Sequence, residues 1–424
     1  MSPRRRGLLI GLAATMLVAA VWAAIVALRP LPDRSFKMAT GPDGSAYALF
    51  GERYRALLAK YGVEVTLVPT DGSYDNVRKL LDPASGVSAA FVQAGAVNQD
   101  AAPGLLSLGT MFYEPLWVFC RCDPDGLDFH ERLGHRVSIG AEGSATRQLV
   151  LRLMKLNRID EHRFELLGYA PEEAADALIA GKIDAVIIDT AWESPAVQKL
   201  LADPSIRIAG YPRADAYVAL LPFLSKVVVP MGAADLADNR PSHDLNLIAS
   251  KASLVVRDDL HPALQYLLID AAQRIHGGPG VFSPAGTFPA PEMIDLPLSA
   301  EAQHMYRSGP SFLRRHLPFW LAELSQRLLI VVIPLIGLIY PITKLLPEVW
   351  RWEMDRRLQR MYTELVKIEI ALRRLGPGPE RAGVRERLDE LEARVHTLRL
   401  PDSFAAPVYE LKQNIRYVQE RYPH

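Results

Sequence analysis

The sequence predicts an α/β domain flanked by two apolar segments and followed by a helical tail. Between residues 35 and 300, short apolar runs alternate with segments of helical apolar spacing, which is typical of a mostly parallel sheet covered by helices on both faces. Long apolar runs occur at Gly7 to Leu28 and Leu328 to Leu346. Residues 350–424 carry apolar side chains at helical spacing among interleaved charges, as in a solvated helical hairpin. A chain of 424 residues is long enough for two or three domains.

The expected strands and helices follow one another in a regular order. Strands are expected where short runs are rich in apolar residues or alternate with polar ones, and helices where apolar residues recur every three or four positions. In chain order, we expect strands at 36–40, 63–70, 87–93, 115–122, 136–140, 164–169 and 183–189, and helices at 45–61, 73–81, 144–156 and 171–180. The tail is expected to form helices at 350–375, 380–400 and 408–422, with a break at Gly376 to Pro379.

Composition excludes several classes of protein. The 48 basic and 48 acidic residues balance, whereas nucleic-acid-binding domains are usually basic. Two cysteines are too few for a disulfide scaffold or a zinc finger.

Cys120 and Cys122 lie two positions apart, so they can form a bridge, offer two metal ligands, or simply be small residues beside a core. We read the scattered histidines His243, His261, His276, His304 and His316 as structural or exposed.

The first apolar segment, Gly7 to Leu28, carries no charge and follows Arg4, Arg5 and Arg6. About 20 apolar residues span a bilayer, and a basic flank places the N-terminus in the cytoplasm. We therefore expect an uncleaved anchor. A cleaved signal peptide is the alternative, although its apolar core is usually about 7–15 residues long.

The second apolar segment, Leu328 to Leu346, contains Pro334 and Pro341, which membrane helices tolerate better than soluble ones. A buried core helix is the alternative. The basic run Arg351 to Arg360 follows it and places the tail in the cytoplasm. We therefore expect a protein that spans the inner membrane twice, with the α/β domain outside.

The chain is expected to have five parts. They are 1–32 as a cytoplasmic arginine cluster and anchor, 33–300 as the exterior domain, 301–327 as a strap near the membrane, 328–347 as the second span, and 348–424 as a cytoplasmic helical hairpin.

Three junctions share one pattern: a strand, a glycine, a hydroxyl residue and then a helix. They are residues 40–47, 70–76 and 140–147. Free N–H groups at helix starts bind anions, and ligands in such sheets lie beyond the carboxyl ends of the strands. Each junction taken alone can be an ordinary helix cap. Together they offer converging hydroxyl and N–H groups suited to a carboxylate, and neither nucleotide-binding glycine motif is present.

Several blocks of the sequence resemble the TAXI family of solute-binding proteins of TRAP-type transporters. They are residues 39–51, 65–80, 89–95, 136–154 and 177–190, and residues 277–299, 306–320 and 351–365 resemble a membrane-tethered subgroup of that family. The resemblance implies a type II periplasmic-binding-protein fold, in which two doubly wound α/β lobes joined by a hinge close on a small organic acid or amino acid. It also implies TRAP permease subunits as a partner. Neither a cofactor nor a metal is expected.

The resemblance also assigns ligand-binding residues by position. They are Gly44, Ser45, Tyr47, Thr70, Gly72, Ser73, Asn76, Gln93, Ser144, Ala145, Thr146, Arg147, Asp189 and Trp192. The sequence departs from the family pattern at Pro42, Asp43, Asp71 and Ala145. Two of these residues, Asp43 and Asp71, are acids near the mouth of the expected cleft, and they favour a ligand that carries an amine. Glu114 matches a position near the cleft in the family, but taken alone it reads as a surface carboxylate.

The leading hypothesis is a membrane-anchored receptor that captures its solute by hinge closure. The alternative is a sensor or scaffold that signals through its helical tail, which can dock a partner or pack on itself. An enzyme is not expected, because the sequence shows no acid–base or nucleophile constellation.

Overall fold

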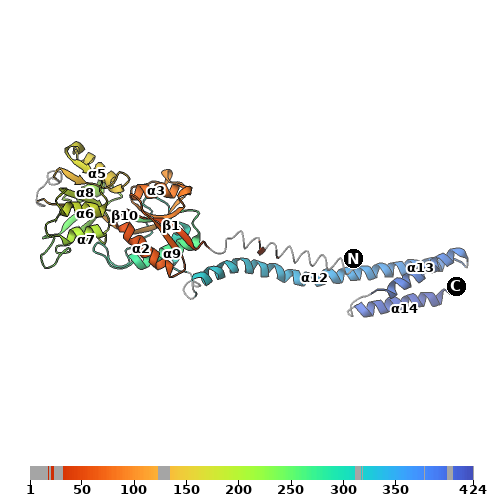
Figure 1. The fold of residues 1–424 in the computed structure, drawn as a ribbon. Helices are drawn as coiled ribbons and strands as arrows, with labels where there is room; N and C mark the ends of the chain where they lie inside the picture. The colour runs from red at the N-terminus through yellow and green to blue at the C-terminus, as the bar shows by residue number, and fades with distance from the viewer. Residues whose placement is uncertain are drawn as a thin grey trace. The chain divides into compact units, whose positions relative to one another are not determined.

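The computed structural model describes residues 18, 21–22, 32–122, 134–310, 317, 319–376, 378–398 and 404–423. The chain folds into two compact units, Met1–Arg327 and Leu328–His424 (Figure 1). The first, here called the binding unit, contains all the described strands. The second, here called the tail unit, is helical.

The strands of the binding unit are β1 (Ser35–Ala39), β2 (Glu64–Val68), β3 (Val87–Gln93), β4 (Leu105–Cys120), β5 (Arg136–Ser138), β6 (Glu165–Leu167), β7 (Ala185–Asp189), β8 (Arg207–Ile208), β9 (Ser225–Val229) and β10 (Leu245–Arg257). Its α-helices are α2 (Ala46–Ala59), α3 (Ser73–Leu81), α5 (Ala145–Leu156), α6 (Pro171–Ile179), α7 (Pro195–Ala202), α8 (Ala214–Leu220), α9 (Pro262–His276) and α10 (Ala300–Ser308). Three short 3₁₀ helices are η1 (Pro83–Ser85), η2 (Gln99–Ala101) and η3 (Glu161–Arg163).

The sheet has the strand order β2-β1-β3-β10-β4-β7-β5-β6, with β8 on β4 and β9 on β10. One group of parallel strands is β2, β1 and β3, and the other is β7, β5 and β6. Each group forms the sheet of one lobe, here called the first and the second lobe. The predicted α/β alternation and the two lobes agree with this topology.

Two long strands, β4 and β10, run antiparallel and connect the lobes. Residues 105–115 of β4 pair with β10, whereas Leu116 to Cys120 pair with β7 in the second lobe. The register between β4 and β10 shifts on both sides of Ser253. The sheet therefore changes partners at Glu114, Pro115 and Leu116, and we call this stretch the crossing point.

Each lobe packs helices on its sheet around its own core. The second lobe buries Trp117 and Phe119 completely among side chains of α5, α6 and α7. The first lobe has one core between its sheet and the helices α2 and α9, and another on the side of α3. In Figure 1, α2 and α9 lie together in the first lobe, and α6 and α7 lie together in the second. Cys120 and Cys122, at the end of β4, form a disulfide, which resolves the alternatives that the sequence left open.

The tail unit is built from the long helix α12 (Phe319–Arg374), which enters it from the binding unit, and from α13 (Pro379–His396) and α14 (Ala405–Arg421). These three helices bury a common core, with Leu365, Ile368, Leu388, Leu411 and Ile415 at most 4% exposed. The predicted helices 380–400 and 408–422 correspond to α13 and α14, whereas the predicted helix 350–375 is only the C-terminal part of α12, which begins at Phe319. Of the two expectations for its apolar stripe, packing of the tail on itself is what the structure shows.

The prediction of two membrane-spanning helices, and with it the two-span topology, is wrong: within the part of the chain that the structure describes, no helix is long and apolar enough to cross a membrane. Apart from Val18, Val21 and Trp22, the first predicted span lies outside the described residues. The second, Leu328 to Leu346, belongs to α12, one helix of 56 residues that continues on both sides of it. Counting apolar residues predicted a separate helix of bilayer length over 328–346. In the structure this run is an internal part of the longer helix α12.

Candidate functional site

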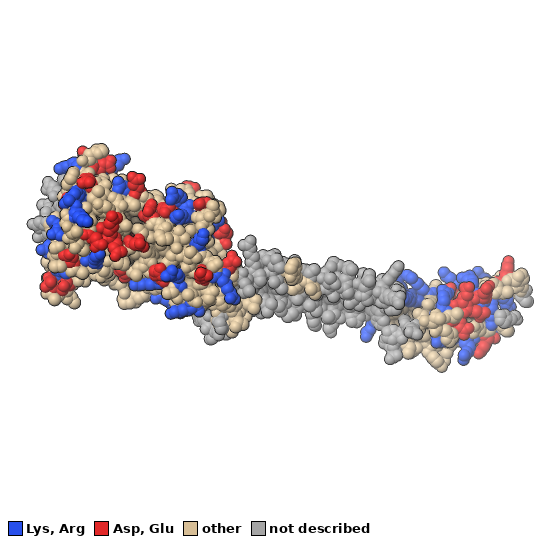
Figure 2. Space-filling model, viewed as in Figure 1, with Lys and Arg blue, Asp and Glu red and all other residues tan. Residues whose placement is uncertain are grey.

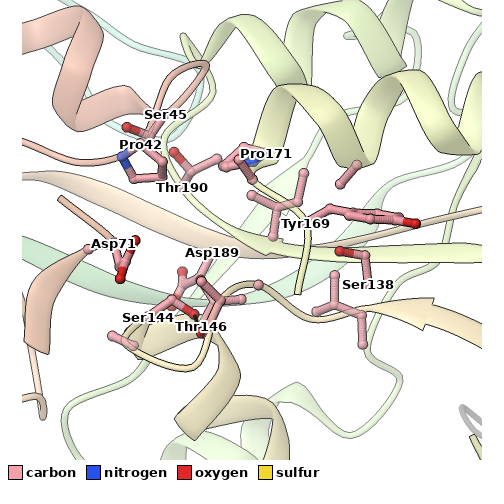
Figure 3. Close-up of a pocket in the computed structure, with 18 of the residues that line it drawn as sticks. Pro42, Ser45, Asp71, Ser138, Ser144, Thr146, Tyr169, Pro171, Asp189 and Thr190 are labelled. Atoms are coloured by element: carbon pink, nitrogen blue, oxygen red, sulfur yellow. Dashed lines mark hydrogen bonds between the residues drawn. The ribbon is translucent and has the colours of Figure 1, made fainter. Parts of the chain in front are cut away.

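A cavity of about 310 Å³ lies between the two lobes, beyond the carboxyl ends of their parallel strands (Figure 3). The first lobe and the crossing point contribute Pro42, Ser45, Tyr47, Asp71, Gly72, Ser73, Gln93 and Glu114. The second lobe contributes Ser138, Gly140, Ala141, Ser144, Ala145, Thr146, Gly168, Tyr169, Ala170, Pro171, Glu173, Ala174, Ile187, Ile188, Asp189 and Thr190. Both lobes thus form one site, because each parallel strand ends at its wall.

The lobes touch at the rim of this cavity. The loop before α2 carries Gly44, whose carbonyl oxygen accepts a hydrogen bond from Ser194 Oγ at 2.6 Å and one from the backbone N–H of Ala196 at 3.4 Å. The backbone N–H of Ala46 donates to Thr190 Oγ1 at 3.2 Å. These bonds join the first lobe to the second across the rim.

Tyr47 anchors a hydrogen-bonded chain on the first-lobe wall. Its hydroxyl donates to Glu114 Oε2 at 2.9 Å and lies 3.1 Å from Ser73 Oγ. Ser73 Oγ in turn accepts the backbone N–H of Gln93 at 2.9 Å, which leaves its own proton for Tyr47 Oη. The ring of Tyr47 stacks on Phe91 with centroids 5.3 Å apart. Packing and hydrogen bonds together fix the position of the Glu114 carboxylate.

Two buried acids line the cavity here: Glu114 lies within the crossing point, and Asp189, at the end of β7, lies next to it. Glu114 is 2% exposed and Asp189 is 7% exposed. Glu114 is paired in register with Ser250 of β10, and Asp189 with Leu116 of β4. Ser250 Oγ donates to Asp189 Oδ2 at 3.3 Å, whereas Asp189 Oδ1 has no hydrogen-bond partner among the described residues. Of the two interpretations of Glu114, the cleft position is confirmed and the surface position is wrong.

Burial raises the pKa of both carboxyl groups well above their usual values. For Glu114 the neighbouring charge of Asp189 adds to the rise, and the hydrogen bond from Tyr47 opposes it. For Asp189 the hydrogen bond from Ser250 opposes the rise. Since a charge is costly to bury without a partner, the pair holds a proton more readily than free carboxylates do.

The start of α5 forms part of the second-lobe wall. Ser144 is its N-cap: its Oγ accepts the backbone N–H of Arg147 at 3.2 Å and donates to the carbonyl oxygen of Ala141 at 2.8 Å. Ser144, Ala145 and Thr146 all line the cavity. The first backbone N–H groups of this helix therefore lie at the wall, where they carry a partial positive charge.

The structure brings most of the predicted site residues together. Those that line the cavity are Ser45, Tyr47, Gly72, Ser73, Gln93, Ser144, Ala145, Thr146 and Asp189. Those that do not line it are Gly44, Thr70, Asn76, Arg147 and Trp192.

The residues outside the cavity support it in other ways. Asn76 Nδ2 donates to the carbonyl oxygens of Thr40 at 2.6 Å and Phe91 at 2.8 Å, and Thr70 Oγ1 donates to the same Thr40 oxygen at 2.8 Å. They thereby hold the ends of the first-lobe strands in place. Arg147 Nη1 donates to the carbonyl oxygen of Gly140 at 3.2 Å, and Trp192 packs 5.8 Å from Trp117, centroid to centroid. Gly44 lies at the rim contact described above.

The main segment that the sequence did not indicate is the loop Gly168 to Ala170, between β6 and α6. It brings Tyr169 and, from the following helix, Glu173 to the cavity. The loop follows the strand–glycine–helix order of the other junctions but has no hydroxyl residue of serine or threonine. A sequence search for a glycine followed by serine or threonine therefore does not find this loop.

Among solved structures, the chain is similar to a protein of Bordetella bronchiseptica RB50, with 16% identity, a TM-score of 0.41, and coverage of 64% of this chain and 87% of that chain. It is also similar to the periplasmic aliphatic sulphonate binding protein SsuA of Escherichia coli, with 12% identity, a TM-score of 0.34, and coverage of 72% and 82%. A putative methionine-binding lipoprotein of Bacillus subtilis has 14% identity, a TM-score of 0.32, and coverage of 58% and 96%. Likenesses at these values do not bear on function.

No curated protein matches the sequence. The family model that matches residues 38–272 is that of the NMT1-like family. These residues run through both lobes, from β1 to α9, and include every residue that lines the cavity. Because the match covers more than half of the 424 residues, the chain belongs to the NMT1-like family.

Proposed function

We propose that this protein is a solute-binding receptor that encloses one small polar solute between its two lobes, without covalent chemistry. The observation that carries this proposal is the cavity of about 310 Å³ whose walls come from both lobes. Cavities of about 300–1,000 Å³ suit small-molecule ligands. A solute held there contacts both lobes at once, so binding favours the closed arrangement over an open one.

The crossing strands supply a hinge for this motion. Strands β4 and β10 place side chains in the cores of both lobes, and β4 changes its partner at Pro115, which has no N–H group to donate. Small rotations at this point open or close the rim, where Gly44 and Ala46 meet Thr190 and Ser194.

A carboxylate is the group that the start of α5 suits. The hydroxyl of Thr146 and the first N–H groups of the helix belong to the second-lobe wall, whereas the Ser144 hydroxyl is already used in the helix cap. A helix of 12 residues presents a partial positive charge at its first turn, which favours an anionic group there. In this proposal the solute is a small organic acid or amino acid, and delivery to a TRAP-type permease follows from the TAXI resemblance.

The test is a thermal-shift screen of the full chain against organic acids and amino acids. A ligand present at 100 times its Kd adds about 2.7 kcal/mol to the free energy of unfolding, which raises the melting temperature visibly. The variant Ala145→Trp, which fills the cavity from the first turn of α5, is expected to lose the shift. If the protein is folded and no solute raises its melting temperature, the proposal is overturned.

A ligand sensor is a second candidate, favoured by the tail unit, whose three helices have a core of their own. Deletion of residues 378–424 distinguishes the two. If solute uptake by cells continues and only a response to the solute is lost, the protein is a sensor. If uptake is lost while purified protein still binds the solute, the protein is a transport receptor.

A further inference from the structure

The charged side chains that line the cavity all have the same sign. They are Asp71, Glu114, Glu173 and Asp189, and the described lining residues include no lysine, arginine or histidine. Figure 2 shows further acidic side chains gathered on the visible face, over the region where Figure 1 places α6 and α7. The first turn of α6 carries Glu172 and Glu173. A cleft lined by one sign of charge attracts ions of the opposite sign.

Within this set, Glu114 and Asp189 are buried, and one buried oxygen of their carboxylates has no hydrogen-bond donor among the described residues. Tyr47 satisfies Glu114 Oε2, and Ser250 satisfies Asp189 Oδ2. Asp189 Oδ1 is buried and has no hydrogen-bond partner among the described residues, although Asp189 lines the cavity and is labelled there in Figure 3. A buried carboxylate oxygen normally has a partner, so this one points to a group that the protein itself does not supply.

We propose that the solute supplies this group: the cavity binds a solute that carries a protonated nitrogen, held by Glu114 and Asp189. The proposal rests on the proposed function, because it names a chemical group of the solute that the same cavity encloses. Ammonium and related cations are donors without acceptors, and they form charge-assisted hydrogen bonds with carboxylates. A purely anionic solute, by contrast, would lie against acids without any basic side chain to offset them.

The position of the two acids links this contact to closure. Glu114 lies on β4 at the crossing point, whereas Asp189 ends β7 in the second lobe. A nitrogen that donates to both carboxylates therefore contacts the hinge and the second lobe together. In this proposal the acidic end of the solute lies at the start of α5, on the same second-lobe wall.

A bound cation favours the ionised form of the pair, whose pKa values burial raises. The titratable groups that act on the pair are Tyr47 from α2 and Tyr211 before α8, and burial raises the pKa of each phenol well above its usual value, so both stay neutral. The remaining charged lining groups, Asp71 and Glu173, are acids as well. When a protonated nitrogen enters, the proton leaves the carboxyl pair for the solvent, and affinity rises with pH until the pair is ionised.

The experiment compares solutes that differ only at the nitrogen. Each amino acid is tested beside its 2-hydroxy acid, in which a hydroxyl replaces the ammonium group, together with simple amines and dicarboxylates. The protein is the full chain, in the wild-type form and as Glu114→Gln and Asp189→Asn, which keep the shape of each side chain but remove its charge. Asp43→Asn is the matched control, because Asp43 is exposed and lies beside the cavity residue Pro42 without lining the cavity.

The proposal expects the nitrogen-bearing solutes to bind and their hydroxy counterparts to bind at least about tenfold more weakly. Each amide variant loses the preference, and Asp43→Asn keeps it. Calorimetric titration in two buffers of different ionisation enthalpy shows a proton released on binding to the wild type. If hydroxy acids or dicarboxylates bind as well as the nitrogen-bearing solutes, this inference is overturned while the proposed function stands. If no organic solute binds, the proposed function is overturned, and this inference with it.

Discussion

At the scale of single residues, His276 shows how burial sets the state of a titratable side chain. Its ring lies 4.6 Å from that of Phe50, 5.2 Å from Phe112 and 5.8 Å from Tyr54, centroid to centroid. Burial lowers the pKa of His276 to about 3, and the charge of Arg53 adds to the effect. The imidazole is therefore neutral near pH 7 and packs against aromatic side chains of the first-lobe core. The sequence interpretation of His276 as structural or exposed is narrowed to structural.

We expect His276→Phe to reduce the acid sensitivity of the protein. The pKa of His276 is lower in the folded protein than in the unfolded chain, so the unfolded state binds a proton first as pH falls from 6.5 toward about 3. The wild type then loses up to about 1.4 kcal/mol of stability per pH unit from this group. Urea unfolding over this range should show a smaller loss in the variant. His304→Phe, which removes an exposed histidine, is the control, and an equal effect of both variants would contradict the prediction.

The contribution of Glu114 to protein stability depends on pH in the opposite sense to that of His276. Because burial raises its pKa above the ordinary value of 4.5, the folded protein holds a proton that the unfolded chain releases. The unliganded protein therefore loses stability as pH rises above that value. Glu114→Gln removes this loss, so we expect a variant that is more stable than the wild type at about pH 8 and closer to it at about pH 4. Unfolding measured without solute tests this, and a variant that is less stable at the higher pH would contradict it.

At the scale of elements, the sequence predicted the strands of both parallel groups and the helices α2, α3, α5 and α6. Glycines, hydroxyl residues and apolar spacing are local signals, and these elements are bounded by them. The first half of β4 was not expected. Gly109 and Pro115 interrupt this stretch as a loop would, but its pairing with β10 continues past Gly109 and as far as Pro115. Strand β10 was missed as well, since its insertion between β3 and β4 depends on residues far away in the sequence.

The loop between β1 and α2 gives a prediction at this scale. Gly44 has a φ of +77°, and a Cβ there would lie 2.8 Å from Glu172 Cβ, across the rim in α6. We expect Gly44→Ala to weaken the contact between the lobes and to lower solute affinity. The matched control is Gly181→Ala, because Gly181 has a similar φ of +68° and no atom within 4 Å of the added Cβ.

Both alanine variants incur the backbone cost of about 1–2 kcal/mol, so only the difference between them reports the rim contact. Denaturant unfolding measures the shared cost, and solute titration measures the difference. Equal affinity in the two variants would show that the rim contact does not contribute to binding.

At the scale of the whole molecule, the chain forms two units with separate cores. The binding unit is built around its two lobes, and the tail unit around the side chains shared by α12, α13 and α14. Cores that share no side chains respond to mutation independently.

We therefore expect core mutations to act on one unit at a time. Leu388→Ala in α13 and Leu178→Ala in α6 each remove a fully buried side chain, at an expected cost of about 2–5 kcal/mol. Hydrogen exchange should show the first variant losing protection in the tail unit only, and the second in the binding unit only. If either variant weakened protection in both units equally, the two units would unfold as one.

The sequence by itself determined the α/β class, the strands of both parallel groups with the helices α2, α3, α5 and α6, and the junctions that reach the cavity, because spacing and turn residues act over a few positions. It also indicated an amine-bearing solute, but from exposed acids. Only the tertiary structure decided that Glu114 is buried, that Asp189 lies next to the crossing point, and that Thr70 and Asn76 hold strand ends instead of lining the cavity. The tertiary structure also shows that the apolar run at 328–346 lies within one continuous helix, α12. Burial and pairing depend on contacts between segments distant in the chain, and no local pattern encodes them.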